Sequence, residues 1–578
     1  MVGPSRRPVA SFAGFALFAS FASLALHAQE SPPPPPPIAP APAPAAAKAP
    51  AAAPPRLVVL IVVDQCRPDY FERFAPRLDG FLARLRDEGR WYPEAEQHHA
   101  ITVTAAGHAA VGTGRFPRRN GIVGNDFFDP EEGRMVGAAN DRSAGKVGGE
   151  GGGFSPHRLH CDGLADWWKQ RWPEGKAIGV SVKPRSAIFP MGKGGDAAYW
   201  IDEATGRMVT SAYYRKEPAP WAVAFEADDP LAKLPQQWDA TLGDAAAYAA
   251  LGCTGDDQAG EALIGANHSR TFPHSLASPK VAVRTQYVLF SPFADDLLLE
   301  FARAAVEGEH LGEDDAPDLL VLGLSATDYI GHRCGPDSWE IAEQLVHLDH
   351  LLAGFVDFAE SKSDGRLLVA LTSDHGVAPL PEVAAAHGQP GARVDWGSLK
   401  PKVSAALAAL SPALAEAALP MPEYALRLDA KKVAESGKSL EEVADGLAAK
   451  LRPDPTFVDV RSRFELERPL AAGDRIGELL HDSSDGPRAG DVYFVLPSGS
   501  IYYAMTGSDA QMALAAATSH GTPHPYDTAV PLVFWGASVK PGRVAGRAWT
   551  VDVAPTLATA VGAPLPPDLD GRPLDLAK

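Results

Sequence analysis

The chain has 578 residues, of which 46% are hydrophobic and 22% are charged, and its formal net charge is -19. This composition is typical of a globular protein and excludes a disordered chain, a collagen-like chain and a polytopic membrane protein. The excess of acidic residues, 72 against 53 basic ones, argues against binding of nucleic-acid polymers and, taken alone, against an anionic substrate.

The first 28 residues have the order of a secretory signal peptide. Arg6 and Arg7 precede an apolar run at positions 9–26, which small residues follow. A retained membrane anchor is the alternative, because a run of this length just spans a bilayer. Residues 29–55 are almost entirely proline and alanine and predict an extended linker, either a tether to the cell envelope or a segment without a role. We expect a periplasmic or secreted protein whose mature chain has no membrane span.

Four short apolar runs predict buried strands, at residues 57–63, 318–324, 366–371 and 530–535. Their continuous, β-branched character is typical of strands covered on both faces in a parallel sheet. Between the second and third runs, apolar residues recur at the spacing of one helix face: Ile341, Leu345, Leu348, Leu352 and Phe355. This alternation predicts an α/β fold with a doubly wound, mostly parallel central sheet flanked by helices.

Two long stretches interrupt the alternation of strands and helices. They cover about residues 130–315 and 381–515. We interpret them as insertions that form a cap over the edge of the sheet. The catalytic domain is then predicted to extend from residue 56 to residue 578, after the linker.

Three of the predicted strands end in turns that carry an aspartate: Asp64, Asp328 and Asp374. Because ligands gather beyond the carboxyl ends of parallel strands, we expect these side chains on one rim. Three histidines accompany them in the sequence: His332, His375 and His520. Taken singly, such an aspartate is more often a helix cap and such a histidine is usually solvated. Together, three carboxylates and three imidazoles suit two Zn²⁺ ions.

Thr104 is the candidate nucleophile. It precedes small residues that can start a helix, so its hydroxyl would lie where backbone N–H groups and the helix dipole favour anions. A threonine hydroxyl becomes a good nucleophile only when a base or a metal lowers its pKa. Without the neighbouring metal ligands, Thr104 would be interpreted as a simple helix cap.

Six motifs follow one another in the chain: VVDQ at 62–65, TAAGH at 104–108, GIVGND at 121–126, TDYIGHRCGPDS at 327–338, SDHG at 373–376, and SHGTPHPYDTAVPLVFWG at 519–536. In this order they resemble the alkaline phosphatase superfamily. The resemblance is strongest to the bacterial phosphate-irrepressible alkaline phosphatases, which use a threonine nucleophile. It covers residue 56 to the C-terminus.

The resemblance implies two zinc sites, one formed by Asp328, His332 and His520, and the other by Asp64, Asp374, His375 and the Thr104 oxygen. It also implies that Asn125, Lys183 and Arg185 bind the phosphoryl oxygens. Pro184 disfavours a helix at Lys183, and in an extended segment Lys183 and Arg185 would share a face. We expect no third, magnesium site, because Lys183 would take its place.

The resemblance implies hydrolysis of small-molecule phosphate monoesters through a phosphothreonine intermediate, and we expect a monomer. Two divalent ions and two cationic side chains would outweigh the three aspartates in the pocket, so the negative net charge no longer argues against an anionic substrate. A phosphodiesterase or nucleotide pyrophosphatase on the same scaffold is the nearest alternative, which the paired cations disfavour because a diester carries less charge. A secreted metal-binding surface protein is the remote alternative.

Overall fold

The computed structural model describes residues 53–504 and 516–577. The predicted signal peptide and most of the predicted linker lie outside these residues. Within the described residues, no helix is both long enough and apolar enough to cross a membrane.

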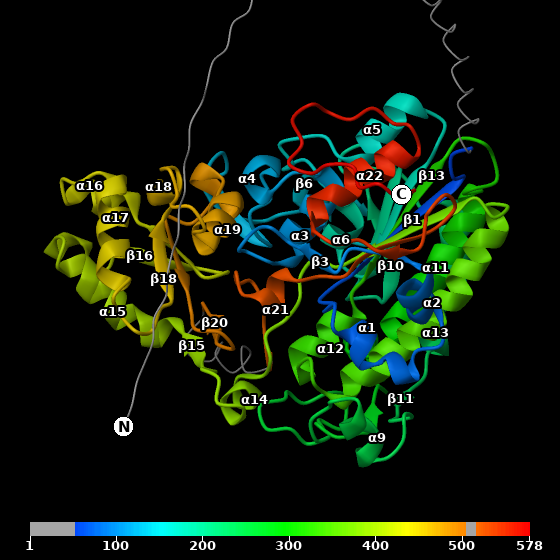
Figure 1. Ribbon diagram of the computed structural model, residues 1–578, viewed down its shortest axis with the longest axis horizontal. Helices are drawn as coiled ribbons and strands as arrows, with labels where there is room; N and C mark the ends of the chain where they lie inside the picture. The colour runs from blue at the N-terminus through cyan, green and yellow to red at the C-terminus, as the bar shows by residue number, and fades with distance from the viewer. Residues whose placement is uncertain (1–52, 505–515, 578) are drawn as a thin grey trace, which may run out of the picture. The chain divides into compact units, whose positions relative to one another are not determined.

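A mixed sheet of eleven strands forms the centre of the described chain (Figure 1). Its five middle strands are parallel and wholly buried: β14 (Leu367–Thr372), β1 (Leu57–Val63), β13 (Asp318–Leu324), β8 (Ala177–Ser181) and β9 (Ala197–Asp202). Burial on both faces explains why these strands appear in the sequence as continuous apolar runs. The predicted α/β class with a large central sheet is confirmed.

The outer strands of the sheet are largely antiparallel. β21 (Leu532–Gly536) pairs antiparallel with β14, with Leu532 opposite Thr372, and β10 (Arg207–Ser211) pairs antiparallel with β9. The run at 530–535 is thus a strand, but it runs opposite to the strands it resembles in sequence. Because β21 starts where β14 ends, the segment before β21 reaches the edge at which the parallel strands end.

Helices cover both faces of the sheet (Figure 1). Alternate residues of β1 enter two hydrophobic clusters, with Val59 and Ile61 in one and Val58 and Leu60 in the other. The first cluster includes α2 (Phe81–Glu88), α11 (Phe293–Glu309) and α13 (Trp339–Lys362). The second includes α3 (Thr104–Thr113), α5 (Leu164–Arg171) and α22 (Val553–Ala560). All five apolar residues of the predicted helix face are buried on α13.

Part of the second interruption forms a smaller α/β layer with its own hydrophobic core. A four-stranded antiparallel sheet lies in it, in the order β16 (Ala418–Met421), β17 (Ala425–Leu428), β19 (Val492–Val495) and β18 (Asp459–Ser462). Two helices, α15 (Trp396–Ala408) and α17 (Leu440–Leu451), contribute to the same core. A second cluster joins this layer to the segment before α3, because Met421 and Ala425 pack with Ile101 and Val103.

Candidate active site

The edge where the parallel strands end collects the three aspartates. Asp64 follows β1, Asp374 follows β14, and Asp328 lies in the first turn of α12 (Ala326–Cys334) after β13. All three are buried, with at most 3% of their surface exposed. The structure therefore brings together at one edge three carboxylates that are far apart in the sequence.

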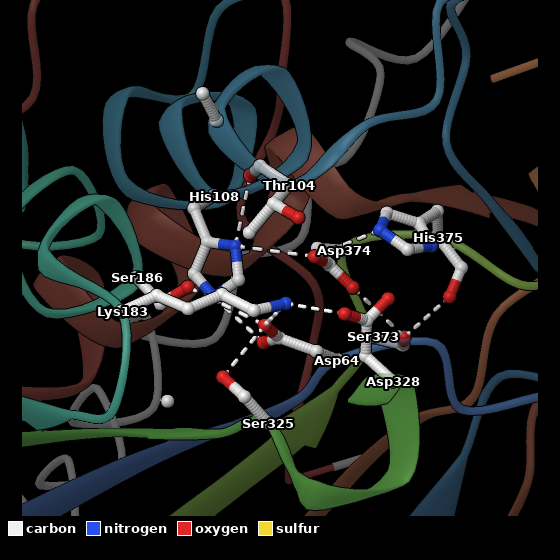
Figure 2. A network of polar contacts seen from close by, with 12 residues as sticks. Asp64, Thr104, His108, Lys183, Ser186, Ser325, Asp328, Ser373, Asp374 and His375 are labelled. Atoms are coloured by element: carbon white, nitrogen blue, oxygen red, sulfur yellow. Dashed lines mark hydrogen bonds and ion pairs between the residues drawn. The ribbon is translucent and has the colours of Figure 1, made fainter. Parts of the chain in front are cut away.

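Carboxylates and imidazoles form two groups there, each with ligand atoms within 4.8 Å of one another: Asp328, His375 and His520, and Asp64, His108 and Asp374. His332 lies beside the first group, with its Nε2 3.3 Å from Asp328 Oδ1. His375 connects the groups, because its Nε2 is 3.2 Å from Asp374 Oδ2 and its ring stacks on His520 at 3.5 Å. Figure 2 shows His108, Asp64, Asp374 and His375 converging on the same space.

Main-chain carbonyl oxygens anchor the rings of all four histidines. Each Nδ1 lies 2.8–2.9 Å from a main-chain carbonyl oxygen, in the pairs His108 with Thr104, His332 with Thr518, His375 with Gly376, and His520 with Thr102. A carbonyl oxygen only accepts, so Nδ1 carries the hydrogen and the Nε2 of a neutral imidazole keeps its lone pair. Such backbone anchoring is typical of metal-binding histidines.

Several buried polar atoms of these groups make no well-aligned hydrogen bond among the described residues and lie only in ion-pair range of one another: Asp64 Oδ1 is 3.2 Å from His108 Nε2, and Asp374 Oδ2 is 3.2 Å from His375 Nε2. Unsatisfied buried groups are costly and call for a partner. A cation bound by the carboxylates and imidazoles would satisfy them, and a mixed nitrogen and oxygen donor set suits zinc. The residues present therefore fit a metal.

Thr104 is the first residue of α3 and is buried. Figure 2 shows its hydroxyl pointing toward Asp374 and His375. The small residues after it have a packing reason, because a Cβ on Gly107 would lie 2.3 Å from the main-chain oxygen of Asp374. Only glycine lets α3 approach the end of β14 so closely.

Lys183 bridges the two groups of ligands. Its Nζ is 3.0 Å from Asp64 Oδ2 and 2.5 Å from Asp328 Oδ2 (Figure 2). Lys183 is extended, with φ -101° and ψ 132°, as Pro184 predicts. The expectation that Arg185 continues this extended segment is wrong. Pro184 opens α6 (Pro184–Ile188), since proline is favoured at the first helical position, and Arg185 lies in its first turn.

The two remaining predicted phosphate ligands lie beside this centre with free donor capacity. Asn125 Oδ1 accepts from the N–H of Ala105 at 2.9 Å, so the side chain lies at the start of α3 with its Nδ2 unused by that contact. Arg185 Nε has no hydrogen-bond partner among the described residues. Both side chains therefore offer N–H groups to an anion.

The charged groups shift one another's pKa values. Although burial disfavours the carboxylate form, Lys183 and the neighbouring histidines hold the pKa values of Asp64 and Asp328 below their ordinary range. Burial lowers the pKa of His375 to about 4, which keeps it neutral. The pKa of His108 rises to about 9 against the effect of burial, because Asp64 and Asp374 stabilise its charged form.

The sequence reasoning gave no role to several residues that the structure brings to the site. His108 stands four residues after Thr104, a helical spacing that could have signalled it. Gln65, with a left-handed φ of 64°, donates from its N–H to Asp374 and from its side chain to Asp328. Glu423, from the insertion, accepts from the N–H of Asn125.

The chain is similar to known proteins over most of its length. The family model described as type I phosphodiesterase / nucleotide pyrophosphatase matches residues 58–526. The alkaline phosphatase PafA of Elizabethkingia meningoseptica is 30% identical over 532 residues, which cover 91% of this chain and 94% of that protein. A calcium-transporting ATPase of Myroides odoratus is 30% identical over 534 residues, covering 90% and 94%.

A solved structure extends this similarity to the fold. The crystal structure of wild-type PafA has a TM-score of 0.81 and 30% identity, and the match covers 91% of this chain and 99% of that one. The chain therefore belongs to the type I phosphodiesterase / nucleotide pyrophosphatase family, which lies within the alkaline phosphatase superfamily that its ordered motifs predicted, and is a phosphoric ester hydrolase.

Proposed function

We propose that this protein hydrolyses phosphate monoesters through a phosphothreonine at Thr104, in a site completed by two zinc ions. One observation carries the proposal. The Thr104 hydroxyl lies at the start of a helix and faces buried carboxylates and imidazoles, which form two groups whose ligand atoms lie within 4.8 Å of one another. Relatives named alkaline phosphatase, similar over nine tenths of the chain, support it further.

The proposed ligands regroup these residues: His375 joins Asp64 and Asp374, His332 joins Asp328 and His520, and His108 is not a proposed ligand. Asp328, His332 and His520 would hold one ion, and Asp64, Asp374, His375 and the Thr104 oxygen the other. Zinc at these positions would supply Lewis-acid chemistry, lowering the pKa of a bound hydroxyl or water and neutralising phosphoryl charge. We propose no third ion, because the Lys183 ammonium fills the space between Asp64 and Asp328.

The proposed reaction has two steps, formation and hydrolysis of a phosphothreonine. In the first, the Thr104 oxygen forms a bond to phosphorus in line with the ester oxygen, which leaves as the alcohol. In the second, water attacks the phosphothreonine, and inorganic phosphate leaves as Thr104 regains its hydroxyl. Asn125 Nδ2, Arg185 and Lys183 stabilise negative charge on the equatorial oxygens, which is the main catalytic task in phosphoryl transfer.

The phosphothreonine can be tested directly. Acid quenching of the zinc-loaded enzyme with a monoester, followed by peptide mass spectrometry, should find the phosphoryl group on Thr104. Thr104→Ala should lose both the modification and turnover, whereas Thr104→Ser should form a phosphoserine at the same position. Unchanged hydrolysis by Thr104→Ala would rule out the covalent route.

A preference for monoesters distinguishes this proposal from the phosphodiesterase or pyrophosphatase alternative that the family description names. Two cations suit the dianionic monoester better than the monoanionic diester. We expect purified enzyme to favour p-nitrophenyl phosphate strongly over its bis-ester, and Arg185→Ala to reduce turnover of the monoester more than that of the diester. The opposite preference in wild type would favour the diesterase.

We also propose that the protein is exported to the periplasm or the medium and acts there as a monomer. The order of residues 1–28, with two cations before an apolar run and small residues after it, supports this location. Cell fractionation with N-terminal sequencing of the mature chain tests export, and light scattering after gel filtration tests the mass. A retained residue 1 in the membrane fraction would contradict cleavage.

A further inference from the structure

The turn between β16 and β17 is the part of the insertion that reaches the proposed phosphate site. Glu423 and Tyr424, within it, both have left-handed backbone conformations, with φ of 70° and 60°. Two successive non-glycine residues in this region are unfavourable and persist only where the surroundings hold them. Such strain is common at functional sites, so the contacts of both side chains are informative.

Glu423 accepts hydrogen bonds from the segment that contains Asn125. Its Oε1 accepts from the N–H of Asn125 at 2.8 Å, and the N–H of Asp126 also donates to the carboxylate. Its Oε2 lies against Gly124, where an added Cβ would be only 2.0 Å away. The backbone of Gly124 is not left-handed, and the atoms nearest to an added Cβ all belong to the Glu423 side chain, so a larger residue here would have to displace that carboxylate.

Tyr424 fixes the other side of the turn. Its carbonyl oxygen accepts from the N–H of Phe494 at 3.0 Å, and its hydroxyl accepts from the N–H of Tyr502 at 3.2 Å. Its ring is 3.5 Å from the place where a Cβ on Gly521, next to His520, would lie. The turn is therefore wedged between the segment that bears Asn125 and the loop that bears His520.

We propose that Glu423 is a positioning residue that fixes Asn125 for the phosphoryl group, an inference that rests on the proposed function. Asn125 is anchored three times: at its Oδ1 by the N–H of Ala105, at its carbonyl oxygen by the N–H of Ala138, and at its own N–H by Glu423. Together these anchors define where Nδ2 lies, and Glu423 supplies the one that comes from the insertion. The insertion thus contributes to phosphate binding although Glu423 is 298 positions away from Asn125 in the sequence.

The matched pair Glu423→Ala and Glu423→Gln tests this role in the zinc-loaded, full chain. Glutamine keeps an oxygen that accepts from the N–H of Asn125, whereas alanine removes it. We expect Glu423→Ala to lower kcat/KM for p-nitrophenyl phosphate and affinity for inorganic phosphate by about tenfold each, and Glu423→Gln to restore most of both. In an Asn125→Ala background, Glu423→Ala should have no further effect, because the residue it positions is gone.

Gly124→Ala tests the same contact independently, by steric displacement of the Glu423 side chain. Its methyl group should displace the Glu423 carboxylate and reproduce the losses of Glu423→Ala, whereas Gly124→Ala combined with Glu423→Ala should lose no more than Glu423→Ala alone. Melting temperatures separate these effects from unfolding, and Glu423→Gln with Gly124→Ala still test the proposal if Glu423→Ala does not fold.

Two results would overturn the role of Glu423: unchanged phosphate affinity and kcat/KM in Glu423→Ala, or an equal loss with and without Asn125. Failure of the proposed function looks different, since wild type would then lack monoesterase activity with zinc supplied. In that case inorganic phosphate affinity, measured by calorimetry, decides alone whether Glu423 acts through Asn125.

Discussion

The Lys183 ammonium balances the negative charge of two buried aspartates, and replacing Lys183 should show how much this contributes to stability. Its ammonium contacts Asp64 at 3.0 Å and Asp328 at 2.5 Å, and its side chain is only 4% exposed. Lys183→Met keeps most of the apolar stem but leaves two buried carboxylates without that partner. Removing one partner of a buried ion pair typically costs about 3–5 kcal/mol, so we expect a loss of this size in the free energy of unfolding.

Zinc should relieve most of this loss, because the ions would neutralise the same carboxylates. With zinc we expect Lys183→Met to cost only about 1–3 kcal/mol, the range for losing hydrogen bonds to charged groups. Chemical denaturation with a chelator and with zinc measures both values. Lys402→Met is the control, because Lys402 and Asp454 form an exposed pair that contributes at most about 1 kcal/mol. An equal cost of Lys183→Met with and without zinc would refute the reasoning.

The same variant has a predictable pH dependence without metal. Asp64 and Asp328 have folded-state pKa values below the ordinary 3.8, because Lys183 and neighbouring histidines outweigh burial. Their contribution to stability is therefore present above pH 3.8 and is lost as the pH falls below it. Lys183→Met lacks part of this contribution, so the stabilities of wild type and variant should converge in acid. A gap that widens in acid would contradict the assigned charge states.

Three further outcomes are expected. Gly107→Ala should destabilise the protein by at least about 1–3 kcal/mol and weaken zinc binding, because its Cβ would meet the main chain of Asp374. Gly145→Ala is the control and should be neutral, because a Cβ there has open space; equal melting temperatures of the two variants would contradict the prediction. Asp349→Ala should cost about 3 kcal/mol or more in urea unfolding, since Asp349 accepts four backbone N–H groups around the start of α2; a change below 1 kcal/mol would contradict this. Raising ionic strength should increase kcat/KM or leave it flat, because the chain carries a charge of -19 and repels anionic substrates; a steep fall would show attraction instead.

Three of the five central strands were predictable, because burial on both faces makes them continuous apolar runs. The interpretation of residues 130–315 as a cap is wrong for β8 and β9, which lie in the central parallel sheet. β1 and β13 coincide with the apolar runs at 57–63 and 318–324. The same uniform burial conceals direction, so the sequence could not distinguish β21, which is antiparallel, from its parallel neighbours. The antiparallel sheet of the second insertion was missed because its four-residue strands are shorter than the helices around them.

The sequence predicted those site residues whose positions follow from the order and direction of the strands. Asp64 and Asp374 follow parallel strands, and parallel strands end at one edge. Glu423 was not predictable, since it occupies a turn of an insertion and no local pattern connects it with Asn125. Arg185 was assigned the wrong backbone because Pro184 acts in two ways, disfavouring a helix before it and favouring one after it.

The four histidines are oriented by main-chain carbonyl oxygens, so their orientation does not depend directly on the side chains of the residues that anchor them. Every residue type offers the same main-chain oxygen, so a mutation at Thr518 or Thr102 leaves the acceptor of His332 or His520 in place as long as the backbone path holds. The imidazole tautomers are thereby buffered against side-chain drift. The surroundings of these rings, including the insertion that bears Glu423, can then change in sequence while the imidazoles keep their orientation.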